Sequence, residues 1–169
     1  MIKLVPYKYC INKELYNMYQ DMPKNEIGVS NIFYGISYNE FIMKSIPYTL
    51  EERIINKSIN TKTKRYILFI NNIPIGELGI RITLNDYWIN KGSQIYYKIR
   101  KCERNKGYGN KILLLGLIEA KKLGFDKVRI NCDDNNIASK KVIINNGGII
   151  DIKSYKTKNG TSTSYIISL

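Results

Sequence analysis

The segment 97–109 constrains the fold more than any other part of the chain. It begins with β-forming residues, continues through a bend with glycines two positions apart, and leads directly into the apolar run 112–118. This order predicts a strand over 94–99, a tight turn, and a well-buried helix over 109–122 that ends at Gly124. We therefore expect a sheet with a helix packed directly against it.

The other expected elements mix helices and strands. They are a strand over 2–5, helices over 12–22 and 38–58, strands over 65–70, 75–84 and 127–132, a helix over 136–146 and a strand over 165–169. Pro47 should end or kink the second helix, and residues 26–37 should form a loop. No linker or repeat divides the sequence, so we expect one domain over 1–169. Its fold class should be α+β, with one mixed sheet covered by helices on both faces.

The formal net charge of +13 could indicate a nucleic-acid partner. The lysines, however, are scattered along a sequence rich in Lys, Asn, Ile and Tyr, the composition expected from codons biased toward A and T. One local cluster, at 98–101 and 104–106, suits a small polyanion. We expect no nucleic-acid partner, and keep a basic nucleic-acid-binding protein as an alternative.

Several absences narrow the chemistry and the location. The chain has no histidine, so any proton transfer must use a carboxylate, Tyr, Cys or water. Cys10, Cys102 and Cys132 are too widely spaced for a disulfide framework or a metal site, so we expect no metal, and we interpret Cys102 and Cys132 as small packed residues. The apolar run 112–118 is too short to cross a bilayer, and no export signal is present. We expect a cytoplasmic protein without a membrane partner.

The bend 104–109 has the properties of an anion site. Its glycines let the backbone approach a ligand closely, and the unpaired N–H groups at the start of the following helix favour an anion. Arg104 and Lys106 add positive charge. The spacing is not that of a Walker loop, and the third glycine of the dinucleotide motif is missing. We predict that the bend binds a pyrophosphate, the alternative being an ordinary strand-to-helix turn.

The same bend resembles motif A of the GNAT superfamily of acetyltransferases, which has the pattern Arg/Gln-x-x-Gly-x-Gly/Ala at a strand-to-helix junction. Further along, Asn136-Ile-Ala-Ser139, followed by Gly147-Gly148, resembles the next motif of the family, where an Asn opens a helix beside the cofactor. Residues 92–109 are most similar to a bacterial branch with the pattern G-G-H-I-G-Y-x-V-R-P-S-E-R-x-K-G-Y-A. The resemblance extends over residues 75–148.

This resemblance implies a mostly antiparallel central sheet, in which parallel strands over 94–99 and 127–132 splay apart into a wedge. It also implies acetyl-coenzyme A as co-substrate, with its pyrophosphate on the backbone of the bend and its pantetheine arm along the strand at 97–99. The implied cofactor-binding residues are Tyr97, Ile99, Arg104, Asn105, Lys106, Gly107, Tyr108, Gly109, Asn136 and Ser139. Asn136 also fits a plain helix N-cap.

The implied reaction is the acetylation of a primary amine, on a small molecule or a peptide, by direct attack in a ternary complex. The backbone N–H of Ile99 would stabilise the oxyanion. Because an amine with a pKa of about 10 must lose its proton, some group has to accept it. Glu77, on the preceding strand, is the first candidate for this general base, with a solvated strand residue as the alternative. The resemblance also implies a monomer or a homodimer.

The sequence departs from the family pattern near the site. Many relatives place a Tyr, as general acid, where this chain has Ile143, and the branch pattern has His and Pro where it has Gln94 and Lys101. These departures leave the proton-transfer residues unassigned. They also leave a further alternative, a coenzyme A-binding module without transferase activity.

Overall fold

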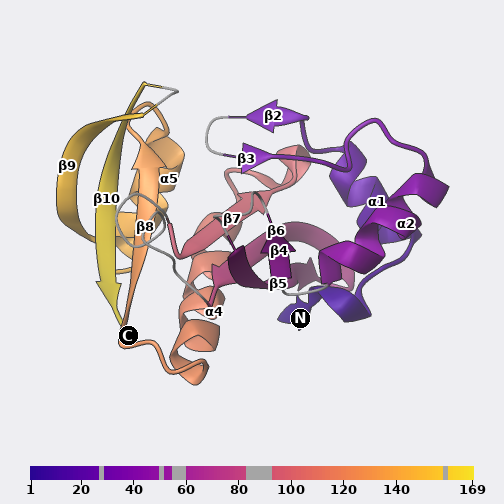
Figure 1. Cartoon of the computed structure of the whole chain (residues 1–169), viewed down its shortest axis with the longest axis horizontal. Coiled ribbons are helices and arrows are strands. Elements are labelled where there is room, and N and C mark those ends of the chain that lie inside the picture. The colour runs from indigo at the N-terminus through magenta and orange to yellow at the C-terminus, as the bar shows by residue number, and fades with distance from the viewer. Residues whose placement is uncertain (27–28, 50–51, 55–59, 83–92, 158–159) are drawn as a thin grey trace.

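An antiparallel sheet forms the middle of the computed structural model (Figure 1). Its strands are β1 (Ile2–Pro6), β5 (Asn60–Ile70), β6 (Ile73–Arg81) and β7 (Ile95–Ile99), in that spatial order, and β4 (Glu52–Ile54) pairs with the start of β5. Asn71 and Asn72 join β5 to β6 with positive φ angles, as a tight two-residue hairpin requires. The structure describes all residues except 27–28, 50–51, 55–59, 83–92 and 158–159.

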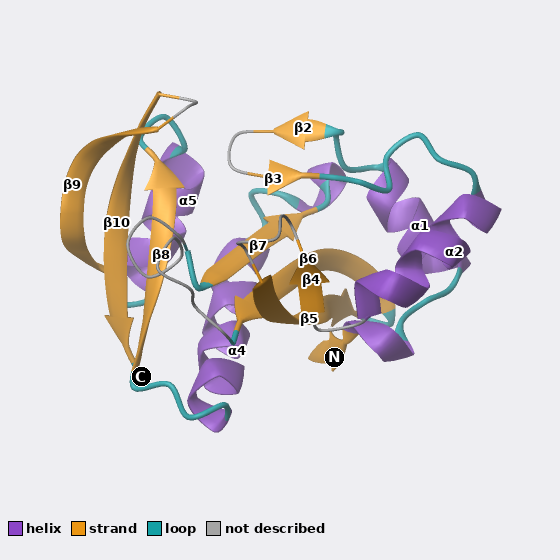
Figure 2. Cartoon of the chain, viewed as in Figure 1, coloured by secondary structure: helices purple, strands orange, loops and turns teal. Residues whose placement is uncertain are grey.

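A second antiparallel sheet, in the order β8 (Lys127–Asp133), β10 (Gly160–Ser168), β9 (Ile149–Thr157), lies beside the first. The two sheets meet where the N–H of Gln94 donates to the carbonyl of Arg129 at 2.8 Å. In Figure 2 the arrows of β7 and β8 both point upwards and separate toward their tips. The single sheet expected from the sequence is therefore split in two, because β7 and β8 diverge beyond this contact.

Helices cover both faces of the central sheet, as predicted. Helices α1 (Lys13–Gln20) and α2 (Tyr38–Thr49) lie on one side and α4 (Tyr108–Lys122) on the other, while α5 (Ile137–Asn145) packs against α4 and β8 (Figure 1). The Asn12 side chain caps α1 by accepting from the N–H of Leu15. Ser37 and Glu40 form a reciprocal capping box at the start of α2.

Several boundaries differ from the sequence prediction. Helix α2 includes Pro47 and ends soon after it, at Thr49, so the proline lies at the end of the helix and does not divide it. The predicted helix does not extend to residue 58: 52–54 form a strand, and 55–58 lie outside the described residues. The predicted loop 26–37 contains a short hairpin of β2 (Asn25–Glu26) and β3 (Val29–Ser30). Strand β9 was not predicted.

Two apolar clusters pack on opposite faces of the central sheet. Alternation along β5 sends Leu68 to the α4 side and Ile67 to the side of α1 and α2. Helix α4 approaches β6 closely at Gly116, where an added Cβ would lie 2.3 Å from Leu78 Cδ1. Both faces of the central sheet are therefore covered, and residues 100–107 connect the end of β7 to the start of α4. None of the helices in the described part of the chain has the length and apolar character of a membrane span.

Candidate functional site

The bend between β7 and α4 is built around left-handed backbone. After β7 the chain forms the 3₁₀ turn η2 (Lys101–Glu103), and Asn105 and Gly107 then adopt φ angles of 61° and 80°. Gly107 is the N-cap of α4, and no side chain among the described residues caps this helix end. The first N–H groups of this 15-residue helix therefore lack a side-chain acceptor there, and the helix dipole favours a negative charge at this end.

A cavity of about 730 Å³ opens at this helix end. Eight of the ten predicted cofactor residues line it: Tyr97, Ile99, Arg104, Asn105, Gly107, Gly109, Asn136 and Ser139. Lys106 and Tyr108 belong to the same bend but do not line the cavity. The lining also includes Lys98, from the basic cluster noted in the sequence, and residues that the sequence did not single out, among them Glu26, Asn110 and Lys141.

The β7 wall of the cavity presents backbone groups. The N–H of Arg100 donates to the carbonyl of Ile75 on β6 at 2.8 Å. Because successive residues of a strand point their backbone groups to opposite sides, the N–H and carbonyl of Ile99 face away from β6. From that side the Nε of Arg104 donates to the Ile99 carbonyl at 3.1 Å. The predicted oxyanion donor is thus directed toward the cavity.

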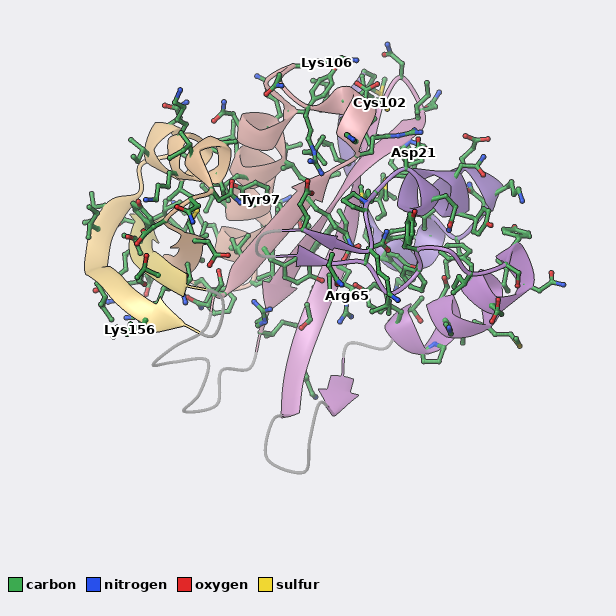
Figure 3. All side chains as sticks on the ribbon, turned by 90° about the horizontal axis from the view of Figure 1, so that it is seen from above. Asp21, Arg65, Tyr97, Cys102, Lys106 and Lys156 are labelled. Atoms are coloured by element: carbon green, nitrogen blue, oxygen red, sulfur yellow. The ribbon has the colours of Figure 1, made fainter. Side chains whose placement is uncertain are left out.

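The α5 wall presents hydroxyl groups. Asn136 caps α5 by accepting from the N–H of Ser139 at 3.1 Å, which is the N-cap role that the sequence analysis had left open. The hydroxyl of Tyr97 lies 2.9 Å from Oγ of Ser139, so this pair connects β7 to α5 (Figure 3 labels Tyr97). Burial raises the pKa of Tyr97 to about 12, with the Ser139 hydrogen bond opposing the rise. Tyr97 is therefore a neutral hydroxyl at physiological pH.

Two ion pairs hold the cations of the bend. Arg104 binds Glu26 of the β2–β3 hairpin through both terminal nitrogens, at 2.5 Å each. Lys106 binds Glu103 at 3.1 Å. Sequence reasoning missed Glu26, because a single acidic residue in a predicted loop gives no indication of a partner 78 positions away.

Comparison with solved structures identifies the fold. An acetyltransferase of the GNAT family from Streptococcus pneumoniae is 14% identical, with a TM-score of 0.61 over 100% of this chain and 98% of the other. An acetyl transferase from Salmonella typhimurium, which modifies the N-terminal serine of a 50S ribosomal subunit protein, is 19% identical, with a TM-score of 0.64 over 99% and 95%. The chain has the GNAT fold.

A third structure with this GNAT fold is an aminoglycoside acetyltransferase in complex with coenzyme A and kanamycin. It is 15% identical, with a TM-score of 0.67 over 99% of this chain and 95% of the other. No protein-family model and no curated protein matches the sequence. The fold is therefore recognisable from the arrangement of the chain in space, where overall sequence similarity is low.

On the opposite face of β7 in this GNAT fold, one buried carboxylate binds several partners. Glu77 is fully buried and lies opposite Lys98 in the β6–β7 register. Its oxygens accept hydrogen bonds from three tyrosine hydroxyls and an ammonium: Tyr19 at 2.6 Å, Tyr48 at 2.9 Å, Tyr96 at 3.0 Å and Lys98 at 3.0 Å. These donors come from α1, α2 and β7, so a single carboxylate joins both N-terminal helices to the central sheet.

The electrostatics of this cluster favour an ionised Glu77. Burial acts to raise its pKa, while the Lys98 ammonium and the hydrogen bond from Tyr19 act to lower it, and the pKa lies below its ordinary value. Glu77 does not line the cavity. Its predicted role as general base stays a prediction, and the contacts by themselves give the side chain a structural role.

The remaining candidates differ in burial. Cys132 is buried, as expected, and burial raises the pKa of its thiol. Cys102 is exposed, so the expectation of a packed residue is wrong there, because Cys102 lies in the 3₁₀ turn η2 at the surface. Ile143, at the position where many relatives carry a Tyr, is fully buried. Within the described ranges no three His, Cys, Asp or Glu side chains come together in a way that could hold a metal ion.

Proposed function

We propose that this protein transfers the acetyl group of acetyl-coenzyme A to a primary amine, by direct attack in a ternary complex. The observation that carries the proposal is the N-terminus of α4, which borders the cavity of about 730 Å³ and has no side-chain cap from the residues that the structure describes. Helix N-termini with this geometry bind phosphate groups. The GNAT fold of the chain and the coenzyme A in one of the structures that share it agree with this ligand.

The residues around the cavity fit the cofactor. A Cβ on Gly107 would meet nothing within 4 Å, so the space above the bend is open to a phosphate. The backbone of residues 104–109 would hold the pyrophosphate, with Asn136 and Ser139 on the facing wall. Acetyl-coenzyme A would supply the acetyl group as a thioester. The Ile99 N–H, directed to the same side, would donate to its carbonyl oxygen as negative charge develops there.

Among proteins with this fold, one modifies a protein N-terminus and another was solved with an aminoglycoside. A first acceptor panel should therefore contain peptides with free N-termini, aminoglycosides and simple polyamines.

The activity is tested by incubating the purified chain with acetyl-coenzyme A and this panel, and measuring the free thiol released. We expect release that depends on one class of amine and on the protein. Tight binding of coenzyme A with no transfer to any amine would instead support the second candidate, a coenzyme A-binding module. The buried, fully occupied carboxylate of Glu77 favours that candidate, since it is the general base predicted from the sequence.

The cofactor site is tested by Gly107→Val, with Gly124→Val as the matched control. Both glycines have left-handed φ angles, 80° and 86°, and neither has an atom within 4 Å of the added Cβ. The backbone strain is therefore the same, but only Gly107 lines the cavity. We expect Gly107→Val to bind coenzyme A at least tenfold more weakly than Gly124→Val, measured by calorimetry. Equal affinities would place the pyrophosphate elsewhere.

A further inference from the structure

Glu26 occupies an unexpected place in a site that we propose for an anion. It lines the cavity, yet its carboxylate is negatively charged, as a pyrophosphate is. Its carboxylate binds both terminal nitrogens of Arg104 in a bidentate arrangement, at 2.5 Å each. The third nitrogen of that guanidinium, Nε, is bound to the carbonyl of Ile99. Every nitrogen of the first residue of the bend thus has a protein partner.

This pairing sets a carboxylate against a phosphate for one cation. Bidentate Arg–carboxylate and Arg–phosphate pairs use the same fork of N–H groups. Arg104 therefore cannot bind both anions through this fork at the same time. Both side chains are partly exposed, 33% for Arg104 and 42% for Glu26, so exchange of the partner needs no rearrangement of the core. Glu103, the other acidic residue in the lining, binds Lys106, which lies outside the cavity.

We propose that Glu26 is a further residue of the cofactor site and that it limits the affinity for coenzyme A by holding Arg104. Binding of the diphosphate exchanges the carboxylate for a phosphate on the guanidinium. The β2–β3 hairpin, which supplies Glu26, is thereby linked to occupancy of the cofactor site. This proposal rests on the proposed function, because it takes coenzyme A as the ligand of the cavity.

The opposite role is also testable. If Glu26 only orients Arg104 toward the phosphates, its removal weakens cofactor binding. If it competes with them, its removal strengthens binding. The sign of the change in affinity therefore decides between a competing residue and a positioning residue.

The experiment is calorimetric titration of coenzyme A into the wild type, Glu26→Gln and the control Asp21→Asn. Asp21 pairs with Arg100 close to the same bend, but neither lines the cavity (Figure 3 labels Asp21). We expect Glu26→Gln to bind about fivefold more tightly, the upper range for a partly exposed ion pair, and Asp21→Asn to bind like the wild type. The gain should shrink at high salt.

A double-mutant cycle with Arg104→Gln completes the test. Because Glu26 acts through Arg104, Glu26→Gln should change nothing once Arg104 is replaced. Unchanged or weaker binding by Glu26→Gln alone overturns the proposal, as does an equal gain in Asp21→Asn or a gain that persists without Arg104. If none of these proteins binds coenzyme A, the proposed cofactor site is refuted, and with it the role of Glu26.

Discussion

Replacement of Glu77 by Gln separates a structural role from a catalytic one. The substitution keeps the shape of the side chain but removes its charge, and it leaves the Lys98 ammonium, whose side chain is only 9% exposed, without a counterion. Breaking a buried ion pair by neutralising one partner costs about 3–5 kcal/mol. Because 1 kcal/mol shifts the melting temperature of a chain of this size by about 2–4 °C, we expect Tm to fall by roughly 6–20 °C.

Thermal unfolding followed by circular dichroism measures this loss, and two further variants control it. Glu119→Gln makes the same substitution in the exposed i,i+3 pair with Lys122, where the expected cost is below about 1 kcal/mol. Adding Lys98→Met to Glu77→Gln should recover part of the lost stability, because it removes the uncompensated cation.

Acetyl transfer is then measured well below the melting temperature of the variant. A Glu77→Gln protein that melts within about 2 °C of the wild type would refute the structural role of Glu77, since the loss of a buried ion pair should lower Tm by more than that. If such a protein had also lost acetyl transfer, Glu77 would be the general base predicted from the sequence.

Two other predictions concern the pH dependence of the Glu77 cluster and a lysine of the cavity. Because the pKa of Glu77 is lowered in the folded chain, its stabilisation is complete above the unfolded pKa of about 4.3 and is lost as pH falls through the folded pKa. The Tm difference between wild type and Glu77→Gln should therefore narrow below about pH 4, and a constant difference down to pH 3 would contradict it. Lys141 lines the cavity, whereas its neighbour Lys140 lies outside it and binds Asp134 at 3.1 Å. Lys141→Gln should weaken coenzyme A binding by about two- to fivefold in calorimetry at low salt, and Lys140→Gln should not; equal effects would exclude a specific contact.

The sequence carried most information where glycines and apolar residues follow each other closely. The helix beginning near Gly109 and the strand before it could be placed to within a residue, because the turn between them demands left-handed backbone and the helix is apolar on most sides. Eight of the ten residues implied by the resemblance line one cavity. The strand and the helix on either side of the bend depend on contacts between residues near each other in the chain.

Long-range partners could not be predicted in this way. Strand β9 was missed although Ile150-Asp151-Ile152-Lys153 alternates apolar and polar residues, and in the structure Ile149, Ile150 and Ile152 are exposed and do not face the core. Glu77 was expected to be available to a substrate, since a lone Glu on a strand gives no sign of donors from two distant helices. Single-sequence patterns report which face is apolar, but not which polar side chains meet across the fold.

The tyrosine-rich surroundings of Glu77 have a consequence for protein engineering. Two of its donors, Tyr19 and Tyr48, come from the N-terminal helices, whereas Tyr96 and Lys98 come from β7. A chimera that exchanges about the first fifty residues for those of a relative would replace the two N-terminal helices, and Glu77 would then lose the hydroxyl donors Tyr19 and Tyr48. Such grafts should fold only when both phenols are transplanted together with the helices, or when the carboxylate and its lysine are replaced by an apolar pair.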